Sequence, residues 1–82
     1  MTELLTGAVE VRVTAGGIPT AIRVARKWVR LTRVMNRWLV EIDWWRVPVR
    51  RHYHRCLMAD GECIEIYHDL EKREWQLARR YD

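Results

Sequence analysis

The chain has 82 residues, of which 49% are hydrophobic, and a formal net charge of +4 at pH 7. This length fits one domain, residues 1–82, and the apolar content is high enough for a core, which excludes a disordered chain. No run approaches the roughly 18–20 apolar residues of a membrane span, and residues 1–7 lack the pattern of a signal peptide. We therefore expect a cytoplasmic protein whose two cysteines are free thiols.

The positive charge is concentrated in the middle of the chain. Residues 23–55 contain ten Lys or Arg residues, four Trp and only two acids, a net charge of +8, whereas both flanks are acidic. Thirteen of the fifteen basic residues are Arg, whose planar guanidinium binds phosphate through two hydrogen bonds and stacks on aromatic rings. A local cationic field interleaved with aromatic side chains is typical of proteins that bind nucleic acids.

The first predicted elements form a hairpin. Valines alternate with polar residues over 9–13, which indicates a half-buried strand. Residues 15–17, Ala-Gly-Gly, supply a turn, and a second alternating strand follows over 18–24.

The central segment is less regular. Residues 28–40 fit two strands with a bend or bulge near Asn36, because the alternation of apolar and basic residues changes parity there. Residues 43–48 are interpreted as a connection, because Pro48 cannot donate a hydrogen bond to a strand ladder.

A second hairpin is predicted over 53–67. Asp60-Gly61 lies between two alternating runs, which favours a type I′ turn. In that register Leu57 faces Ile64, and Met58 faces Cys63 on the other side of the hairpin. The same register places Cys63 on one face with His54 and Cys56.

The last segment has two interpretations. Asp69 is a suitable cap for a helix over 69–81, with an apolar stripe through Leu70 and Leu77. The alternative is a turn at 71–73 followed by a strand through Trp75, Leu77 and Tyr81.

The order of these landmarks resembles a small, largely uncharacterised bacterial domain family. That family occurs as a stand-alone protein and at the C-terminal end of Y-family, translesion-type DNA polymerase-like proteins. The resemblance covers nearly the whole chain and rests on Val9–Val13, Gly17-Ile18-Pro19, Val34–Trp38, Trp44-Trp45-Arg46, Arg51-His52-Tyr53, Asp60-Gly61, Tyr67–Leu70 and Trp75.

The resemblance implies a compact β-rich domain tied to DNA repair or mutagenic synthesis, with no catalytic role established. It favours a strand over a helix at the C-terminus. The family has a glycine just before its final tryptophan, where this chain has Lys72-Arg73-Glu74.

We therefore predict an all-β fold of about six short antiparallel strands in a twisted sheet or small open barrel. The alternative is an α+β fold with a C-terminal helix at 69–81. Closing the sheet would hide the unpaired edges of an arginine-rich sheet. The predicted core is Val9, Val11, Val13, Ile22, Val24, Leu31, Trp38, Leu57, Ile64, Ile66 and Trp75.

For function, the sequence predicts a non-catalytic nucleic-acid-binding accessory module associated with DNA repair or translesion synthesis. Arginines would hold phosphate, and Trp44 or Trp45 would stack on a base, since neighbours on an extended strand point to opposite sides and one indole is expected at the surface. The predicted nucleic-acid-binding residues are Arg26, Lys27, Arg30, Arg33, Arg37, Trp44, Trp45, Arg46, Arg50, Arg51 and Arg55.

The alternative is a protein-interaction module, which docks a polymerase-like or other repair protein, or a second copy, through the tryptophan patch and an exposed strand edge. The sequence does not predict the oligomeric state.

Residues suited to catalysis or to metal binding are sparse. The chain has no serine, no phosphate-binding glycine motif and no Cys-x-x-Cys pair. His52, His54 and Cys56 alternate along one strand, which is a weak pattern for zinc, and nothing in the sequence indicates an activated thiolate. We expect no enzyme activity, metal ligand or cofactor.

Overall fold

The computed structural model describes residues 7–44 and 47–81, which form seven strands. They are β1 (Gly7–Val9), β2 (Val11–Val13), β3 (Pro19–Val24), β4 (Lys27–Trp44), β5 (Val47–Met58), β6 (Cys63–Asp69) and β7 (Glu74–Tyr81). All neighbours in the sheet are antiparallel. The predicted all-β fold is therefore confirmed. The alternative helix over 69–81 does not form, because β7 occupies that segment.

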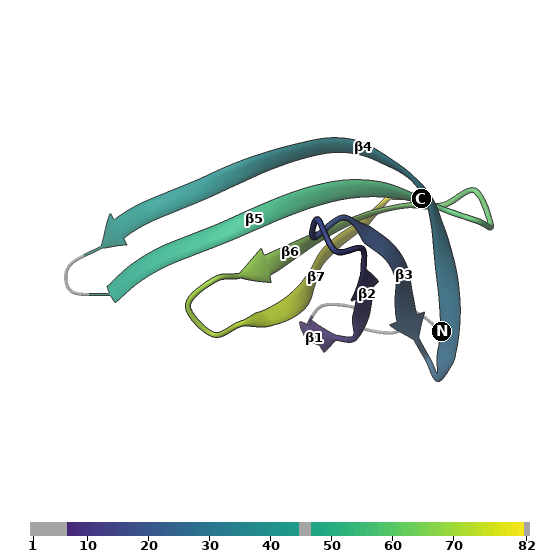
Figure 1. Ribbon diagram of the computed structural model, residues 1–82, viewed down its shortest axis with the longest axis horizontal. Coiled ribbons are helices and arrows are strands. Elements are labelled where there is room, and N and C mark those ends of the chain that lie inside the picture. Colours follow the sequence, from purple (N-terminus) through teal and green to yellow (C-terminus); the bar gives the residue numbers. More distant parts are fainter. Residues whose placement is uncertain (1–6, 45–46, 82) are drawn as a thin grey trace.

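The sheet curls into a half-barrel whose two edges are joined by a single residue. The strand order is β1-β7-β6-β5-β4-β3-β2, so β1 and β2 are the outermost strands on opposite edges. Only Glu10 separates them in the chain, and its carbonyl accepts a hydrogen bond from the Arg23 N–H at 2.9 Å. Figure 1 shows β1 and β2 lying between β3 and β7. The N-terminal segment thus spans the opening of the curled sheet.

The predicted first hairpin is present, but its first strand is divided. Residues 11–13 pair with β3, whereas residues 7–9 pair with β7 at the other edge. Gly17 adopts a positive φ of 83° in the turn, a conformation that glycine reaches without steric cost.

The central segment forms one strand rather than two. β4 runs through 18 residues and contains register shifts between Leu31 and Arg33 and between Val34 and Asn36. The expected bulge near Asn36 is therefore present, and it bends a strand that continues on both sides.

The expected connection over 43–48 is shorter than predicted, because β5 already begins at Val47 and Pro48 is opposite Asp43. Here β5 has a strand on one side only, since its pairing with β6 ends where Arg51 meets Asp69. The carbonyl of Arg50 accepts a hydrogen bond from Leu70 on the β6 side, and residues two apart in a strand point their backbone groups the same way. At position 48 the backbone N–H would therefore point to the open side, which has no partner strand among the described residues. Proline lacks this N–H, and no ladder hydrogen bond is lost.

The β5–β6 turn differs from the predicted type I′ turn by one residue. Gly61 N–H donates to the Met58 carbonyl at 2.9 Å, and Met58 N–H donates to Glu62 at 2.8 Å. Only Gly61 has a positive φ, 93°, so a three-residue loop ends in a left-handed glycine.

This longer turn changes the register of the hairpin. Leu57 lies opposite Cys63, and Cys56 lies opposite Ile64. A shift of one residue moves side chains to the other face. The prediction that Cys63 shares a face with Cys56 was therefore wrong.

The turn between β6 and β7 replaces the expected glycine with a strained residue. Arg73 has a φ of 56°, and its N–H donates to the Asp69 carbonyl at 2.7 Å. The Asp69 side chain also accepts hydrogen bonds from the N–H groups of Glu71 and Lys72, at 3.0 and 3.1 Å. These bonds hold a four-residue turn that has no glycine.

The core lies on the concave face of the curled sheet. Its buried hydrophobic residues are Ile22, Leu31, Cys56, Met58, Ile64, Ile66 and Leu77. Predicted core residues Val9, Val11, Val24 and Trp75 pack against this cluster. Val13 is 45% exposed, and the register places Trp38 and Leu57 on the convex face, so these three predictions were wrong.

Candidate nucleic-acid interface

Three aromatic side chains lie side by side on the convex face. Trp38, Tyr53 and Tyr67 are direct partners across β4, β5 and β6, and direct partners share a face of a sheet. The ring centroids of Trp38 and Tyr53 are 5.3 Å apart, with planes within 7° of parallel. Those of Tyr53 and Tyr67 are 4.9 Å apart. We call these three residues the aromatic ladder.

Two arginines of β5 lie over this ladder. Arg51 and Arg55 flank Tyr53 in a period of two and therefore share its face. The Arg51 guanidinium carbon is 4.6 Å from the Tyr67 ring centroid. That of Arg55 is 5.2 Å from the ring of Tyr81 on β7 and 5.8 Å from that of Trp38. These cation–π contacts restrict both side chains and keep two positive charges close to the ladder.

The carboxylates of the same face are engaged elsewhere. Glu65 and Asp69 lie opposite Arg55 and Arg51 in the register, but both are only 8% exposed. Glu65 accepts a hydrogen bond from the Tyr81 hydroxyl at 3.2 Å, and Asp69 holds the following turn. Within the described residues, neither guanidinium has a carboxylate oxygen within 4.0 Å.

A second arginine–aromatic contact extends the convex face toward β2. The Arg12 guanidinium carbon is 4.2 Å from the ring centroid of Trp28, which is partly exposed. Arg23 also lies on this face, opposite Trp28, but forms an ion pair with Glu10 at 2.8 Å.

The predicted binding residues do not form one surface. Arg30, Arg33, Arg51 and Arg55 have register positions on the convex face. Lys27, Arg37 and Arg50 lie at positions of the opposite face, and Arg26 lies in the β3–β4 turn. Arg50 is paired with Glu41 at 3.3 Å and with Glu71 at 3.9 Å. Trp45 and Arg46 lie outside the described residues, and so does the side chain of Trp44.

Sequence reasoning missed the residues that surround the convex arginines. Tyr53, Tyr67 and Tyr81 were not among the predicted binding residues, and Trp38 was assigned to the core. The alternation Arg51-His52-Tyr53-His54-Arg55 was the available signal, because it places both arginines and the tyrosine on one face of a strand.

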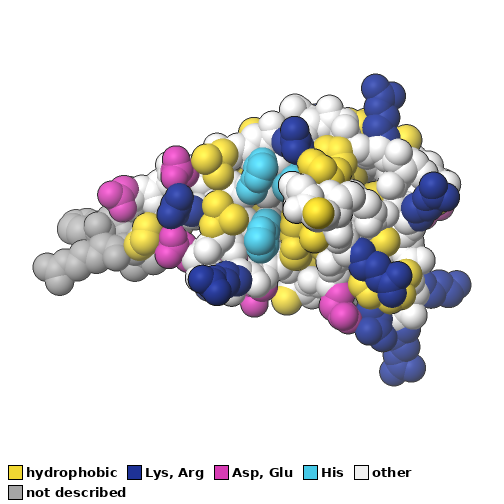
Figure 2. Space-filling model, viewed as in Figure 1, with side chains coloured by type: hydrophobic (Ala, Val, Ile, Leu, Met, Phe, Trp, Pro, Cys, Tyr) yellow, Lys and Arg dark blue, Asp and Glu magenta, His cyan; other side chains and the backbone are white. Residues whose placement is uncertain are grey.

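The histidines gather on the concave face instead. His52 lies opposite His68, and the ring centroids of His52 and His54 are 4.6 Å apart. His68 stacks on Trp75 at 4.7 Å. Figure 2 shows histidine side chains near the centre of the view, with most of the Lys and Arg side chains toward the margins. The histidine cluster and the convex arginines are therefore separated by the sheet.

Burial determines the protonation of this cluster's innermost groups. His54 is 2% exposed, and desolvation, with smaller contributions from His52 and Arg37, lowers its pKa to about 4. Burial raises the pKa of the Cys56 thiol to about 12, so this cysteine is a neutral core residue rather than an activated nucleophile. Within the described residues, no three His, Cys, Asp or Glu side chains are placed to hold a metal ion.

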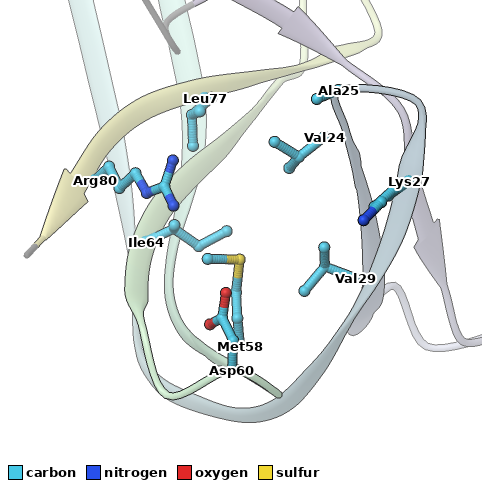
Figure 3. A pocket seen from close by; sticks show the side chains of 9 residues that line it. All are labelled: Val24, Ala25, Lys27, Val29, Met58, Asp60, Ile64, Leu77 and Arg80. Atoms are coloured by element: carbon cyan, nitrogen blue, oxygen red, sulfur yellow. The ribbon is translucent and has the colours of Figure 1, made fainter. Parts of the chain in front are cut away.

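Lys27 lies beside a cavity of about 290 Å³ at one end of the curled sheet (Figure 3). Core side chains such as Met58 and Ile64 form its apolar wall, and the charged ends of Lys27, Asp60 and Arg80 point toward it. Because its apolar lining belongs to the concave core, the cavity does not extend the positive convex face.

Comparison with known proteins adds no functional information: no family model, curated protein or solved structure matches this chain. The resemblance to the polymerase-associated bacterial family therefore stays a prediction. Among the described residues, no helix is long and apolar enough to cross a membrane.

Proposed function

We propose that this protein is a non-catalytic nucleic-acid-binding module that holds phosphate groups on its convex face. The observation that carries the proposal is the pair Arg51 and Arg55, held over aromatic rings with no carboxylate within 4.0 Å among the described residues. A guanidinium restricted in this way loses less conformational entropy on binding phosphate than a free surface arginine.

The packing of the ladder favours phosphate contact over base stacking. The Trp38 and Tyr53 rings face one another, and the Arg51 guanidinium lies over Tyr67. A base stacks on a free aromatic face, and these faces are largely occupied within the protein. We therefore assign the ladder the role of positioning arginines. Stacking of a base on Trp44 or Trp45 stays a prediction, because neither side chain is among the described ones.

The association with DNA repair or translesion synthesis rests on the sequence resemblance alone. It belongs to the proposal as a setting in which such a module would act. No partner protein or pathway follows from the convex face itself.

The test is fluorescence anisotropy with labelled single-stranded and duplex oligonucleotides at about 50 and 200 mM salt, the range over which phosphate contacts weaken measurably. The double variant Arg51→Gln/Arg55→Gln is compared with Arg50→Gln/Arg80→Gln. Arg50 and Arg80 form ion pairs with glutamates and lie on the concave face, so the control removes the same charge from the other side.

We expect the double variant Arg51→Gln/Arg55→Gln to bind the oligonucleotides at least tenfold more weakly than the parent protein. For duplex DNA, its slope of log affinity against log salt should be shallower by about 1.8, or 0.9 for each lost contact. The control should keep most of the affinity of the parent protein. Absence of binding at the lower salt, or an equal loss in both variants, would overturn the proposal.

A further inference from the structure

The outer edge of β4 has no partner strand among the described residues from Thr32 onward. β3 pairs with β4 only at 27–30, and the other side of β4 pairs with β5 from Leu31 to Trp44. The far end of this edge belongs to an arm formed by 41–44 of β4 and 47–50 of β5, which extends beyond the end of β6 (Figure 1). Leu39 and Ile42, which lie along the open stretch of β4, are 53% and 50% exposed.

The register shows which backbone groups point outward. The Arg50 carbonyl points to the β6 side. Backbone groups alternate along a strand, so those of Val49 and of the other odd-numbered residues of β5 point to β4. Val49 is opposite Ile42, which therefore turns its backbone groups inward to β5. It follows that Leu39, Glu41 and Asp43 direct their N–H and C=O groups to the open side.

The open edges of β5 and β4 differ in how they hinder pairing with a further strand. On β5, Pro48 removes an outward N–H group, a common device against edge pairing. On β4, the Asn36 side chain accepts the Arg37 N–H at 2.9 Å, and the bulges lie on the far side of Asn36. The regular stretch beyond Arg37, up to Asp43, has no such device. It is the part of the edge that another strand can join.

This stretch is complementary to itself. If two copies pair antiparallel with Val40 opposite Val40, Arg37 lies opposite Asp43 twice, and Trp38 lies opposite Ile42 twice. Opposite charges and aromatic–β-branched pairs are favourable cross-strand neighbours. Among the described residues no cation lies within 4.0 Å of the Asp43 carboxylate, so none of them competes with Arg37 of a second copy.

Neighbouring registers are less favourable. A pairing centred on Glu41 puts two carboxylates directly opposite each other, which is destabilising. A pairing centred on Leu39 puts Arg37 opposite Glu41, whose carboxylate already accepts a hydrogen bond from Arg50 at 3.3 Å. It also brings the bulged residue Met35 opposite Asp43.

We propose that two copies of this chain associate antiparallel through the β4 edge, about a two-fold axis at Val40. The backbones pair over 38–42, and the Arg37 side chain, whose N–H stays on Asn36, lies opposite Asp43 at each end. Pairing about such an axis keeps the same face outward on both copies, so the two convex faces become continuous. The two β5 strands then lie three strand spacings apart, about 14 Å. The proposal does not depend on nucleic-acid binding, and it is tested without nucleic acid.

The first test is disulfide cross-linking under mild oxidation. At the centre of the pairing Val40 forms a non-hydrogen-bonded pair with its own copy, in which Cα atoms lie about 4.5 Å apart, within disulfide range. Ile42 is the matched control, because it shares the strand and the convex face, but its two copies are about 14 Å apart. We expect Val40→Cys to form a covalent dimer and Ile42→Cys to stay at the level of the parent protein.

The second test is charge reversal, read by sedimentation velocity over a range of protein concentration. Arg37→Asp or Asp43→Arg alone places like charges opposite each other and should weaken association at least tenfold. The double swap should restore it. Within one chain Arg37 is opposite His54 and Asp43 is opposite Pro48, so no contact between them in the monomer explains a rescue.

Three outcomes would overturn the proposal. They are equal cross-linking of the two cysteine variants, a parent protein that stays monomeric up to millimolar concentration, and a double swap that associates no better than the single variants. Circular dichroism of each variant separates these outcomes from unfolding.

Discussion

The two faces of the curled sheet are made by the same strands but have opposite chemistry. Along β5 the concave positions His54, Cys56 and Met58 are buried, whereas the convex positions Arg51 and Arg55 carry charge over aromatic rings. A strand alternates its side chains between faces, so one segment contributes to both the core and the surface. The basic, aromatic centre of this chain therefore contributes alternate residues to two faces: one builds the core, and the other is the face for which we propose phosphate binding.

The largest expected effect is on the concave side. Ile66→Ala removes a fully buried side chain from the core and should lower the free energy of unfolding by about 2–5 kcal/mol, the usual cost of such a cavity. Denaturant titration measures the change. Ile66→Val, with an expected loss of about 0.5–1.5 kcal/mol, serves if the alanine variant does not fold. A loss below that of the valine variant would place Ile66 outside the core.

Low pH should destabilise the protein through His54, which lies on the same concave face. The pKa of His54 falls from 6.5 to about 4 on folding, so between these values the unfolded chain binds more protons. The contribution of neutral His54 to stability is therefore fully present above pH 6.5. It is lost as the pH falls toward 4, by up to about 3 kcal/mol.

Unfolding curves of the parent protein and His54→Gln, measured from pH 7 to pH 4, isolate this contribution. The variant should lose stability less steeply over that range. Identical pH profiles would show that His54 titrates normally in the folded protein.

Changes on the convex side should affect binding more than stability. Tyr53→Leu removes the centre of the aromatic ladder and should cost about 1 kcal/mol of stability, the usual value of aromatic pair contacts. It should also weaken oligonucleotide binding, because Arg51 and Arg55 lose the packing that positions them. Thermal unfolding and anisotropy measure the two effects. Unchanged affinity would remove the ladder from the binding mechanism.

The smallest effect is expected in the β3–β4 turn, which belongs to neither face. Ala25 and Arg26 both have positive φ angles, 49° and 70°, in a two-residue hairpin turn that favours Asn-Gly. The double variant Ala25→Asn/Arg26→Gly should gain roughly 0.5–1 kcal/mol of stability. It should bind oligonucleotides as the parent does, if the convex face carries the binding. A large loss of affinity would restore Arg26 to the interface.

Much of the fold was predictable from alternation alone. The hairpins and the buried Ile22, Leu31, Ile64 and Ile66 follow from the period of two. The errors have local causes. The loop at Asp60-Gly61 has three residues rather than two, and this single residue moved Leu57 to the convex face. A single bulge near Asn36, as predicted, would put Leu31 and Trp38 on the same face. β4 contains two bulges, whose shifts cancel, so Trp38 lies on the convex face, opposite to Leu31.

The candidate site was less predictable than the fold. Composition located the positive charge within 23–55, but a count of arginines does not distinguish Arg51 from Arg50. The first lies over Tyr67, and the second is paired with two glutamates on the other face. That distinction depends on register and on partners distant in sequence. The tryptophan pair at 44–45 is prominent in the sequence, and its side chains lie outside the described residues.

The position of Glu10 has a consequence for the order in which the protein folds. The segment around it must pair with β3, close in sequence, and also with β7, where Ala8 meets Gln76. Contacts between residues so far apart in the chain form slowly, because a long loop must close first. From β3 to β7 each strand pairs with the next one in the chain, so these hairpins can assemble one after another. We therefore expect the pairing of β1 with β7, which seals the half-barrel, to form last in folding and to open first.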